Sequence, residues 1–271
     1  MTVYYNENDP FAAAWLRELI KENMIAQGDV DERSIKEVKT DDLKNYTQCH
    51  FFAGIGVWSY SLRNAGYPDD RRVWTGSCPC QPFSAAGQRG GFDDKRHLWP
   101  DWFRLIRESK PDTIFGEQVA SKDGLGWFDL VSTDLEGQGY AVGAADLCAA
   151  GVGAPHIRQR LYFVAHTEHA ERRTECKEDS DSYGRNGFRG RGYSDSLDNS
   201  ADSRPNGVVG GFWSDCDWLA CIDGKARPVE PGTFPLAHGI TNRVGLLRGY
   251  SNSLVAPQAQ AFIEAYLEVV G

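Results

Sequence analysis

The stretch QCHFFAGIG, residues 48–56, ends a short apolar run at two glycines that stand two positions apart. The apolar run predicts a strand, and the glycines permit a tight turn in which the backbone can approach a ligand closely. Residues 58–65, which follow, predict a helix that Gly66 can close. A strand, a glycine turn and a helix in this order predict an α/β sheet with a ligand site at the strand ends.

The same alternation of apolar runs and amphipathic stretches extends over residues 1–166 and predicts one α/β domain. Composition changes after His166, because residues 167–211 are rich in Ser, Asp, Glu, Arg and Gly and poor in large aliphatic side chains. Such a segment is either mobile or ordered by a ligand. Residues 212–235 predict a small β unit. Further strands are expected at 73–75, 113–115 and 161–165, and helices at 11–20, 97–109 and 258–270.

Composition sets broad limits on the class of protein. The chain has 271 residues, 41% of them hydrophobic, and contains no apolar stretch of about 18 residues, so we expect no membrane span. Its N-terminus predicts no secretory signal. Seven irregularly spaced cysteines fit a reduced, cytoplasmic setting better than a disulfide framework. The net charge of −9 argues mildly against nucleic-acid binding, although an acidic protein can hold a basic cleft.

The run GSCPCQPFS, residues 76–84, presents Cys80 between a proline and a glutamine directly after a predicted strand. A lone cysteine is more often structural than catalytic, and Cys78 with Cys80 has the wrong spacing for a zinc pair, so no metal site is expected. The run resembles the nucleophile loop of the DNA cytosine-5 methyltransferases. The resemblance implies that Cys80 is the catalytic thiolate and that Pro79, Gln81 and Ser84 position the loop and the base.

Two further segments resemble motifs of the same family. GEQV, residues 116–119, resembles its Glu-Asn-Val motif and implies that Glu117 holds and protonates ring nitrogen 3 of the cytosine. Gln118 departs from the family's Asn there. Residues 156–160, HIRQR, resemble its Gln-x-Arg-x-Arg motif, with His156 in the place of the glutamine. The resemblance implies that Arg160 contacts the keto oxygen of the base and that Arg158 helps to position it.

The cofactor motifs occur in an unusual order. Phe52, Ala53, Gly54, Ile55 and Gly56 resemble the family's S-adenosylmethionine loop, but the ribose and adenine segments that usually follow are absent before residue 76. Two N-terminal segments resemble them instead. The resemblance implies that Glu7 is the acid that binds the ribose and that Asp29 and Val30 contact the adenine. The resemblance therefore implies a local permutation that leaves the sheet unchanged. Asn252, in the segment RGYSNSLV, resembles the family's last motif, which packs against the cofactor.

Together, the resemblance implies a Rossmann-like S-adenosylmethionine-dependent methyltransferase sheet. Residues 1–166 and 240–271 would form the catalytic and cofactor-binding domain, and 167–239 a small target-recognition region. The implied activity is methylation of carbon 5 of a cytosine that is flipped out of double-stranded DNA. The enzyme is expected to be a monomer in a bacterial cytoplasm. Whether a phage encodes it and whether it is paired with a restriction nuclease are open questions. Two alternatives remain: an enzyme acting on RNA or with another one-carbon electrophile, and a DNA-binding protein without turnover. The amino-acid sequence does not show which DNA sequence is recognised, nor whether residues 167–211 are ordered in the absence of DNA.

Overall fold

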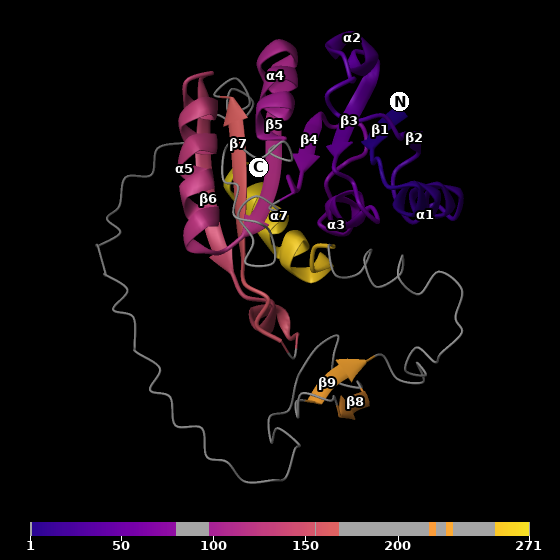
Figure 1. Cartoon of the computed structure of the whole chain (residues 1–271), viewed down its shortest axis with the longest axis vertical. Helices are drawn as coiled ribbons and strands as arrows, with labels where there is room; N and C mark the ends of the chain where they lie inside the picture. The colour runs from indigo at the N-terminus through magenta and orange to yellow at the C-terminus, as the bar shows by residue number, and fades with distance from the viewer. Residues whose placement is uncertain are drawn as a thin grey trace.

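The computed structural model describes residues 2–79, 98–154, 156–167, 217–220, 226–229 and 253–270. Within them, a seven-stranded sheet has the order β2-β1-β3-β4-β5-β7-β6, and β8 and β9 form a separate two-stranded sheet (Figure 1). The strands are β1 (Thr2–Asn6), β2 (Gly28–Asp31), β3 (Tyr46–Phe51), β4 (Val73–Gly76), β5 (Thr113–Val119), β6 (Tyr140–Leu147), β7 (Arg160–Thr167), β8 (Asp217–Ala220) and β9 (Ala226–Val229).

Strand β7 runs opposite to its neighbours, and its first residues lie at the edge of the sheet where β3, β4 and β5 end, which we call the functional edge. Strands β1 to β5 pair only in parallel with one another, whereas β7 runs antiparallel to both β5 and β6. The last residue of β5, Val119, therefore pairs with the first residue of β7, Arg160. Because parallel strands bring their carboxyl ends to one edge, side chains at the start of β7 join those at the ends of β3, β4 and β5.

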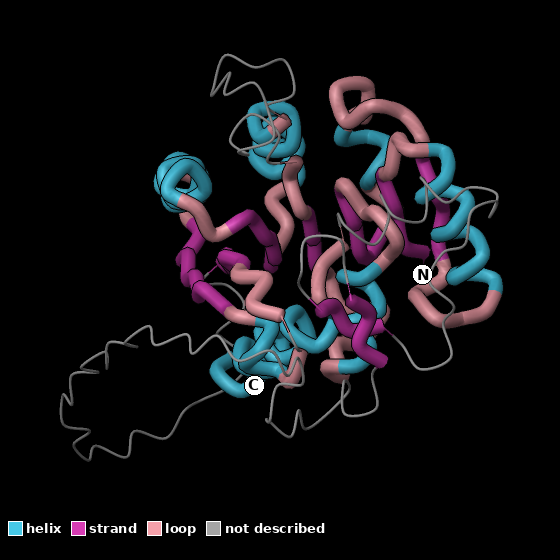
Figure 2. The backbone as a smooth tube through the Cα atoms, turned by 60° about the horizontal axis from the view of Figure 1, so that its bottom comes forward, coloured by secondary structure: helices cyan, strands magenta, loops and turns pink. Residues whose placement is uncertain are grey.

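Helices cover both faces of the sheet, as Figure 2 shows. On one face lie α2 (Thr40–Leu43), α4 (Trp99–Ser109) and α5 (Lys122–Glu136), and on the other α1 (Pro10–Lys21), α3 (Val57–Asn64) and α7 (Ala256–Val270). Successive strand residues serve opposite faces, since Ile114 packs with α4 and Phe115 packs with α3 and α7. The domain is thus a three-layer α/β structure, as expected from the sequence.

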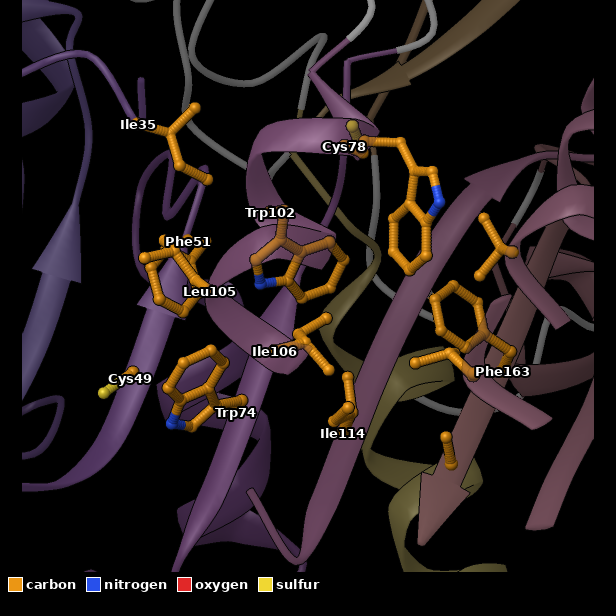
Figure 3. Packing of buried hydrophobic residues seen from close by; sticks show 14 of the residues in the cluster. Ile35, Cys49, Phe51, Trp74, Cys78, Trp102, Leu105, Ile106, Ile114 and Phe163 are labelled. Atoms are coloured by element: carbon orange, nitrogen blue, oxygen red, sulfur yellow. The ribbon is translucent and has the colours of Figure 1, made fainter. Parts of the chain in front are cut away.

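Tight packing fixes the end of β4, from which the Cys80 segment continues. A side chain at Gly76 would bring its Cβ within 2.6 Å of the Trp102 ring, so only glycine fits there. Cys78 is buried in the same hydrophobic cluster as Trp102 and Phe163 (Figure 3). The chain therefore leaves the sheet in a defined direction two residues before Cys80.

The predicted elements are confirmed where the structure describes them, and further elements accompany them. Strands β5 and β7 extend beyond the expected 113–115 and 161–165, and β8 and β9 lie within 212–235, where a small β unit is expected. Helices α2 and α5 and strand β6 had no counterpart in the sequence-based prediction. The permutation is accommodated as expected: β1, which precedes Glu7, pairs with both β2 and the glycine-loop strand β3. Among the described residues, no helix is both long and apolar enough to span a membrane.

Candidate active site

The site begins where β4 and β5 end side by side. Gly76 pairs with Gly116, so the next residues, Ser77 and Glu117, are neighbours across the two strands. Pro79 is the last residue described on this segment. Cys80, Gln81 and Ser84 lie outside the described residues, and their predicted roles remain predictions.

Gln118 anchors the segment that leads to Cys80. Its side-chain amide nitrogen donates to the carbonyl oxygen of Cys78 at 3.4 Å, while its amide oxygen accepts from the backbone N–H of Val119 at 2.9 Å. Gln118 is buried, so these partners satisfy polar atoms that would otherwise be costly to bury. The residue that departs from the family's Asn thus ties β5 to the residue two positions before Cys80.

Glu117 and Arg160 form an ion pair at the functional edge. The Oε1 atom of Glu117 lies 2.9 Å from Nε of Arg160, and the two side chains are only 12% and 19% exposed. Tyr162 stands directly opposite Glu117 in the β5–β7 ladder, which puts Arg160 on the same face of the sheet as Glu117. The predicted proton donor and the predicted base clamp are therefore brought together.

Burial sets the protonation of this acid. Burial raises the pKa of the Glu117 carboxyl above the ordinary glutamate value, and the positive charge of Arg160 only partly opposes that effect. A raised pKa keeps the carboxyl protonated to higher pH, as a group that delivers a proton near neutrality requires. The electrostatics therefore fit the role that the sequence predicts for Glu117.

Arg158 connects the start of β7 to the C-terminal helix. Its Nη2 donates to the carbonyl oxygen of Ser253 at 2.6 Å, three residues before α7 begins. Burial lowers the pKa of its guanidinium, and the like charge of Arg160 lowers it further. The Arg158 backbone is in the left-handed region with φ of 29°, which costs energy for a non-glycine residue. In this structure Arg158 positions the backbone, while His156 is exposed.

The predicted cofactor loop has the backbone that its glycines suggested. Phe52, Gly54 and Gly56 have φ of 52°, 55° and 79°, and Gly56 caps the start of α3. No heavy atom lies within 4 Å of the position that a Cβ would take on Gly54, so one side of the loop is open to a ligand. Ala53, by contrast, is buried, and its N–H bonds to the carbonyl of Asn6.

Glu7 braces this loop from the end of β1. Its Oε2 accepts from the N–H of Gly54 at 2.7 Å, and its Oε1 accepts from the N–H of Asp9 at 2.9 Å. Burial raises the pKa of the Glu7 carboxyl, although the backbone N–H groups of Asp9, Gly54 and Asn8 act in the opposite direction. The structure thus joins two predicted cofactor residues, Glu7 and Gly54, that are 47 positions apart in the chain.

Asp29 and Val30 lie farther out, on the edge strand β2. Asp29 precedes the end of β2 by two residues, and its carboxylate accepts from the hydroxyl of Tyr46 at 2.9 Å. Both residues line a cavity of about 410 Å³ together with Tyr4 and Arg17. Their predicted adenine contacts remain a prediction, and Asn252 lies outside the described residues.

Two contacts at the site involve residues that the sequence-based prediction omitted. The hydroxyl of Ser77 hydrogen-bonds to the carboxyl of Glu117, and Nε1 of Trp58 donates to Oγ of Ser77 at 3.1 Å. The only sequence signal for Ser77 is a hydroxyl one residue beyond a predicted strand. Trp58 had none, because it lies on α3 and its partner Ser77 follows β4, 19 positions later in the chain.

Comparison with known proteins gives this geometry a context. The sequence model described as C-5 cytosine-specific DNA methylase matches residues 1–187. Type II methyltransferase M.HhaI of Haemophilus parahaemolyticus is 34% identical over 99 residues, which cover 35% of this chain and 30% of that protein. Type II methyltransferase M.Bsp6I of Bacillus sp. strain RFL6 is 28% identical over 169 residues, 60% of this chain and 44% of that protein. The chain thus matches less than half the length of either relative.

A solved structure gives a weaker likeness. A mutant of DNMT2 from Spodoptera frugiperda aligns with a TM-score of 0.44 at 17% identity, covering 66% of this chain and 46% of that one.

Proposed function

Because the chain belongs to the C-5 cytosine-specific DNA methylase family, we propose that it methylates carbon 5 of cytosine in double-stranded DNA. The methyl donor is S-adenosylmethionine, and the target base is flipped out of the duplex. One observation carries the proposal: the largely buried pair of Glu117 and Arg160, 2.9 Å apart, at the strand end beside the segment that leads to Cys80. A carboxyl and a guanidinium held this close can hydrogen-bond to two neighbouring atoms of a cytosine, ring nitrogen 3 and the keto oxygen.

Each residue has one task in the proposed reaction. The Cys80 thiolate forms a bond to carbon 6 while Glu117 delivers its proton to ring nitrogen 3, so the ring becomes an enamine with a nucleophilic carbon 5. Arg160 donates to the keto oxygen of the base and stabilises the negative charge that gathers there. Carbon 5 then forms a bond to the methyl carbon while the bond from that carbon to the donor sulfur breaks, and the sulfur keeps the electron pair. Water removes the proton from carbon 5, the bond from sulfur to carbon 6 breaks, and nitrogen 3 returns its proton to Glu117.

The loop after β3 fits a bound S-adenosylmethionine. Gly54 leaves one side of the loop open, and the Glu7 carboxylate lies against the same backbone, within reach of a hydroxyl-bearing ligand. Phe52, Ala53, Ile55 and Gly56 complete the loop, while Asp29 and Val30 would hold the adenine at the outer edge. When bound, the cofactor supplies an electrophilic methyl group. The protein residues hold it in place.

The remaining parts of the chain complete the proposal. Residues 1–166 and 240–271 form the catalytic and cofactor-binding domain, including Asn252, and residues 167–239 recognise the target. Pro79, Gln81 and Ser84 hold the Cys80 loop against the flipped base, and Arg158 supports it. The enzyme acts as a monomer in a bacterial cytoplasm, and the type II names of its relatives favour a restriction-modification setting.

A product assay tests the proposed function directly. The protein is incubated with S-adenosylmethionine whose methyl group is deuterated and with a mixed-sequence duplex DNA, and the digested nucleosides are examined by mass spectrometry. We expect deuterated 5-methylcytosine from the wild-type protein and none from Cys80→Ser. Label in another base, or none at all from a folded protein, would contradict the proposal.

The same assay separates the alternatives. Transcripts of the same sequence as the duplex replace the DNA in a parallel reaction, and label found only in RNA would assign the enzyme to RNA. Binding of duplex DNA with equal affinity by the wild-type protein and by Cys80→Ser, without label in either, would assign a binding role without turnover.

A further inference from the structure

Ser77 contacts the carboxyl of Glu117 from the neighbouring strand. It is the first residue after β4, and the pairing of Gly76 with Gly116 places it beside Glu117. Ser77 and Glu117 lie on the sheet face covered by α3 and α7, whereas Cys78 packs into the cluster on the opposite face. The strand register thus places the Ser77 side chain beside Glu117.

Trp58 determines which way the Ser77 hydroxyl points. The indole nitrogen can only donate, so Oγ of Ser77 is the acceptor of the 3.1 Å hydrogen bond from Nε1 of Trp58. The hydroxyl proton of Ser77 is then left for the carboxylate of Glu117, which can only accept when ionised. Trp58 is itself fixed, because it is 3% exposed and packs against Phe115 and Tyr162.

We propose that Ser77, oriented by Trp58, is a positioning residue that holds the carboxyl of Glu117 for proton transfer to the cytosine. This inference rests on the proposed methylation reaction. Trp58 is the second residue of α3, directly after the glycine loop, so the chain of contacts runs from the cofactor side of the site to the base side.

The charges around Glu117 show what Ser77 adds. Arg160 lies 2.9 Å away on β7, Arg158 precedes the same strand, and Tyr162 pairs with Glu117 across the β5–β7 ladder. Burial raises the pKa of Glu117, while both arginines and the Ser77 hydrogen bond lower it. During the reaction Arg160 must also serve the keto oxygen of the base. Ser77 is then the donor that can stay on Glu117 and let it release its proton.

The test compares Ser77→Ala with a matched variant of the same strand. Thr75 lies two residues earlier on β4, on the same face, and its hydroxyl bonds to Nδ1 of His50 at 2.8 Å. Thr75→Val therefore removes a buried hydroxyl without touching Glu117. Thermal melts show that each variant is folded, and Ser77→Thr, which keeps the hydroxyl, serves as the rescue.

Two readouts distinguish positioning from general support of the fold. Glutamate labelled with ¹³C at the side-chain carboxyl gives a titration of Glu117 in the full-length protein, assigned by its loss in Glu117→Gln. We expect Ser77→Ala to titrate at higher pH than wild type, and Thr75→Val to match wild type. For methylation, we expect kcat to fall about tenfold in Ser77→Ala with little change in KM for DNA, and the alkaline limb to move to higher pH.

The carboxyl titration needs neither DNA nor cofactor, so it decides the role of Ser77 even if no methylation is detected. A titration of Glu117 that is unchanged in Ser77→Ala would overturn the proposal. So would an equal displacement in Thr75→Val, since the effect would then come from loosening β4. Trp58→Phe should give a smaller displacement in the same direction as Ser77→Ala.

Discussion

Glu7 and Glu117 are two acids at the ends of parallel strands, and they are held in different ways. Burial raises the pKa of both carboxyls. Glu7 is bound by backbone N–H groups, those of Asp9 and Gly54 among them, whereas Glu117 is bound by side chains, the guanidinium of Arg160 and the hydroxyl of Ser77.

The difference in hydrogen-bond donors suits Glu7 to a structural role and Glu117 to a reacting role. Backbone donors belong to the strand ends and the glycine loop, so they cannot turn away from Glu7 without unfolding the loop. The side-chain donors of Glu117 can rotate or change partner when a base arrives. The cofactor half of the sheet therefore uses its acid to hold a shape, and the catalytic half uses its acid to exchange a proton.

Replacing the reacting acid gives the largest expected effect. Glu117→Gln keeps the size of the side chain but cannot donate a carboxyl proton, so we expect the rate of methyl transfer to fall by about 10²–10⁴-fold. Single-turnover kinetics with saturating DNA and cofactor measures it. Glu136→Gln, an exposed acid at the end of α5, is the matched control. A loss below about threefold would contradict a role for Glu117 in proton transfer.

Replacing the brace should weaken cofactor binding and spare the chemistry. Glu7→Gln removes the charge that strengthens the bond from the N–H of Gly54, so we expect about tenfold weaker binding of S-adenosylhomocysteine. Isothermal titration calorimetry measures this affinity, with Glu18→Gln, on the surface of α1, as control. At saturating cofactor the methylation rate should stay within about twofold of wild type. An unchanged affinity in Glu7→Gln would sink the brace assignment.

Removing the link from β7 to the C-terminal helix should have a moderate effect. Arg158→Met loses the hydrogen bond to the carbonyl of Ser253, and we expect the free energy of unfolding to fall by about 1–2 kcal/mol. Hydrogen exchange in α7 should rise more than in α1, because only α7 follows the lost contact. Arg107→Met, on an exposed part of α4, is the control. Equal exchange in α7 of both variants would show that the contact does not hold the helix.

The smallest expected effect is a pH dependence of stability. Because the pKa of Glu117 is raised on folding, the native protein binds more protons than the unfolded chain at pH values above the ordinary glutamate pKa. Its contribution to stability therefore falls as pH rises from about 4.3 toward the raised pKa. The melting temperature of wild type relative to Glu117→Gln should decline by roughly 2 °C between pH 4 and 7. A rise in the melting temperature of wild type relative to Glu117→Gln over that range would mean that folding lowers the pKa of Glu117, which would contradict the account.

The sequence predicts the parts of the fold that carry strong local patterns. Apolar runs that end at glycine, such as the run before Gly54, become strands of the large sheet as expected. Strand β6 was missed because Ala141, Gly143, Ala144 and Ala145 make up much of it, and small residues give no alternation. Its strand conformation comes from antiparallel pairing with β7, which is a tertiary effect.

The candidate site likewise contains residues that the sequence predicts and contacts that it does not. Glu117, Arg158 and Arg160 stand in short motifs that the sequence displays, and the reversed strand β7 brings Arg160 to Glu117. The contact of Ser77 with Trp58 joins the end of β4 to the start of α3 and depends on strand register. No local pattern encodes such a contact.

Covalent trapping tests the central claim most directly. Duplex DNA with 5-fluorocytosine at its cytosine positions is incubated with the protein, with and without S-adenosylmethionine, and run on a denaturing gel beside Cys80→Ser. Fluorine at carbon 5 cannot leave as a proton, so the adduct between sulfur and carbon 6 persists after methyl transfer. The account predicts a shifted band that requires both the cofactor and Cys80. A band that persists in Cys80→Ser, or none from the folded wild-type protein on a random-sequence duplex pool, would contradict it.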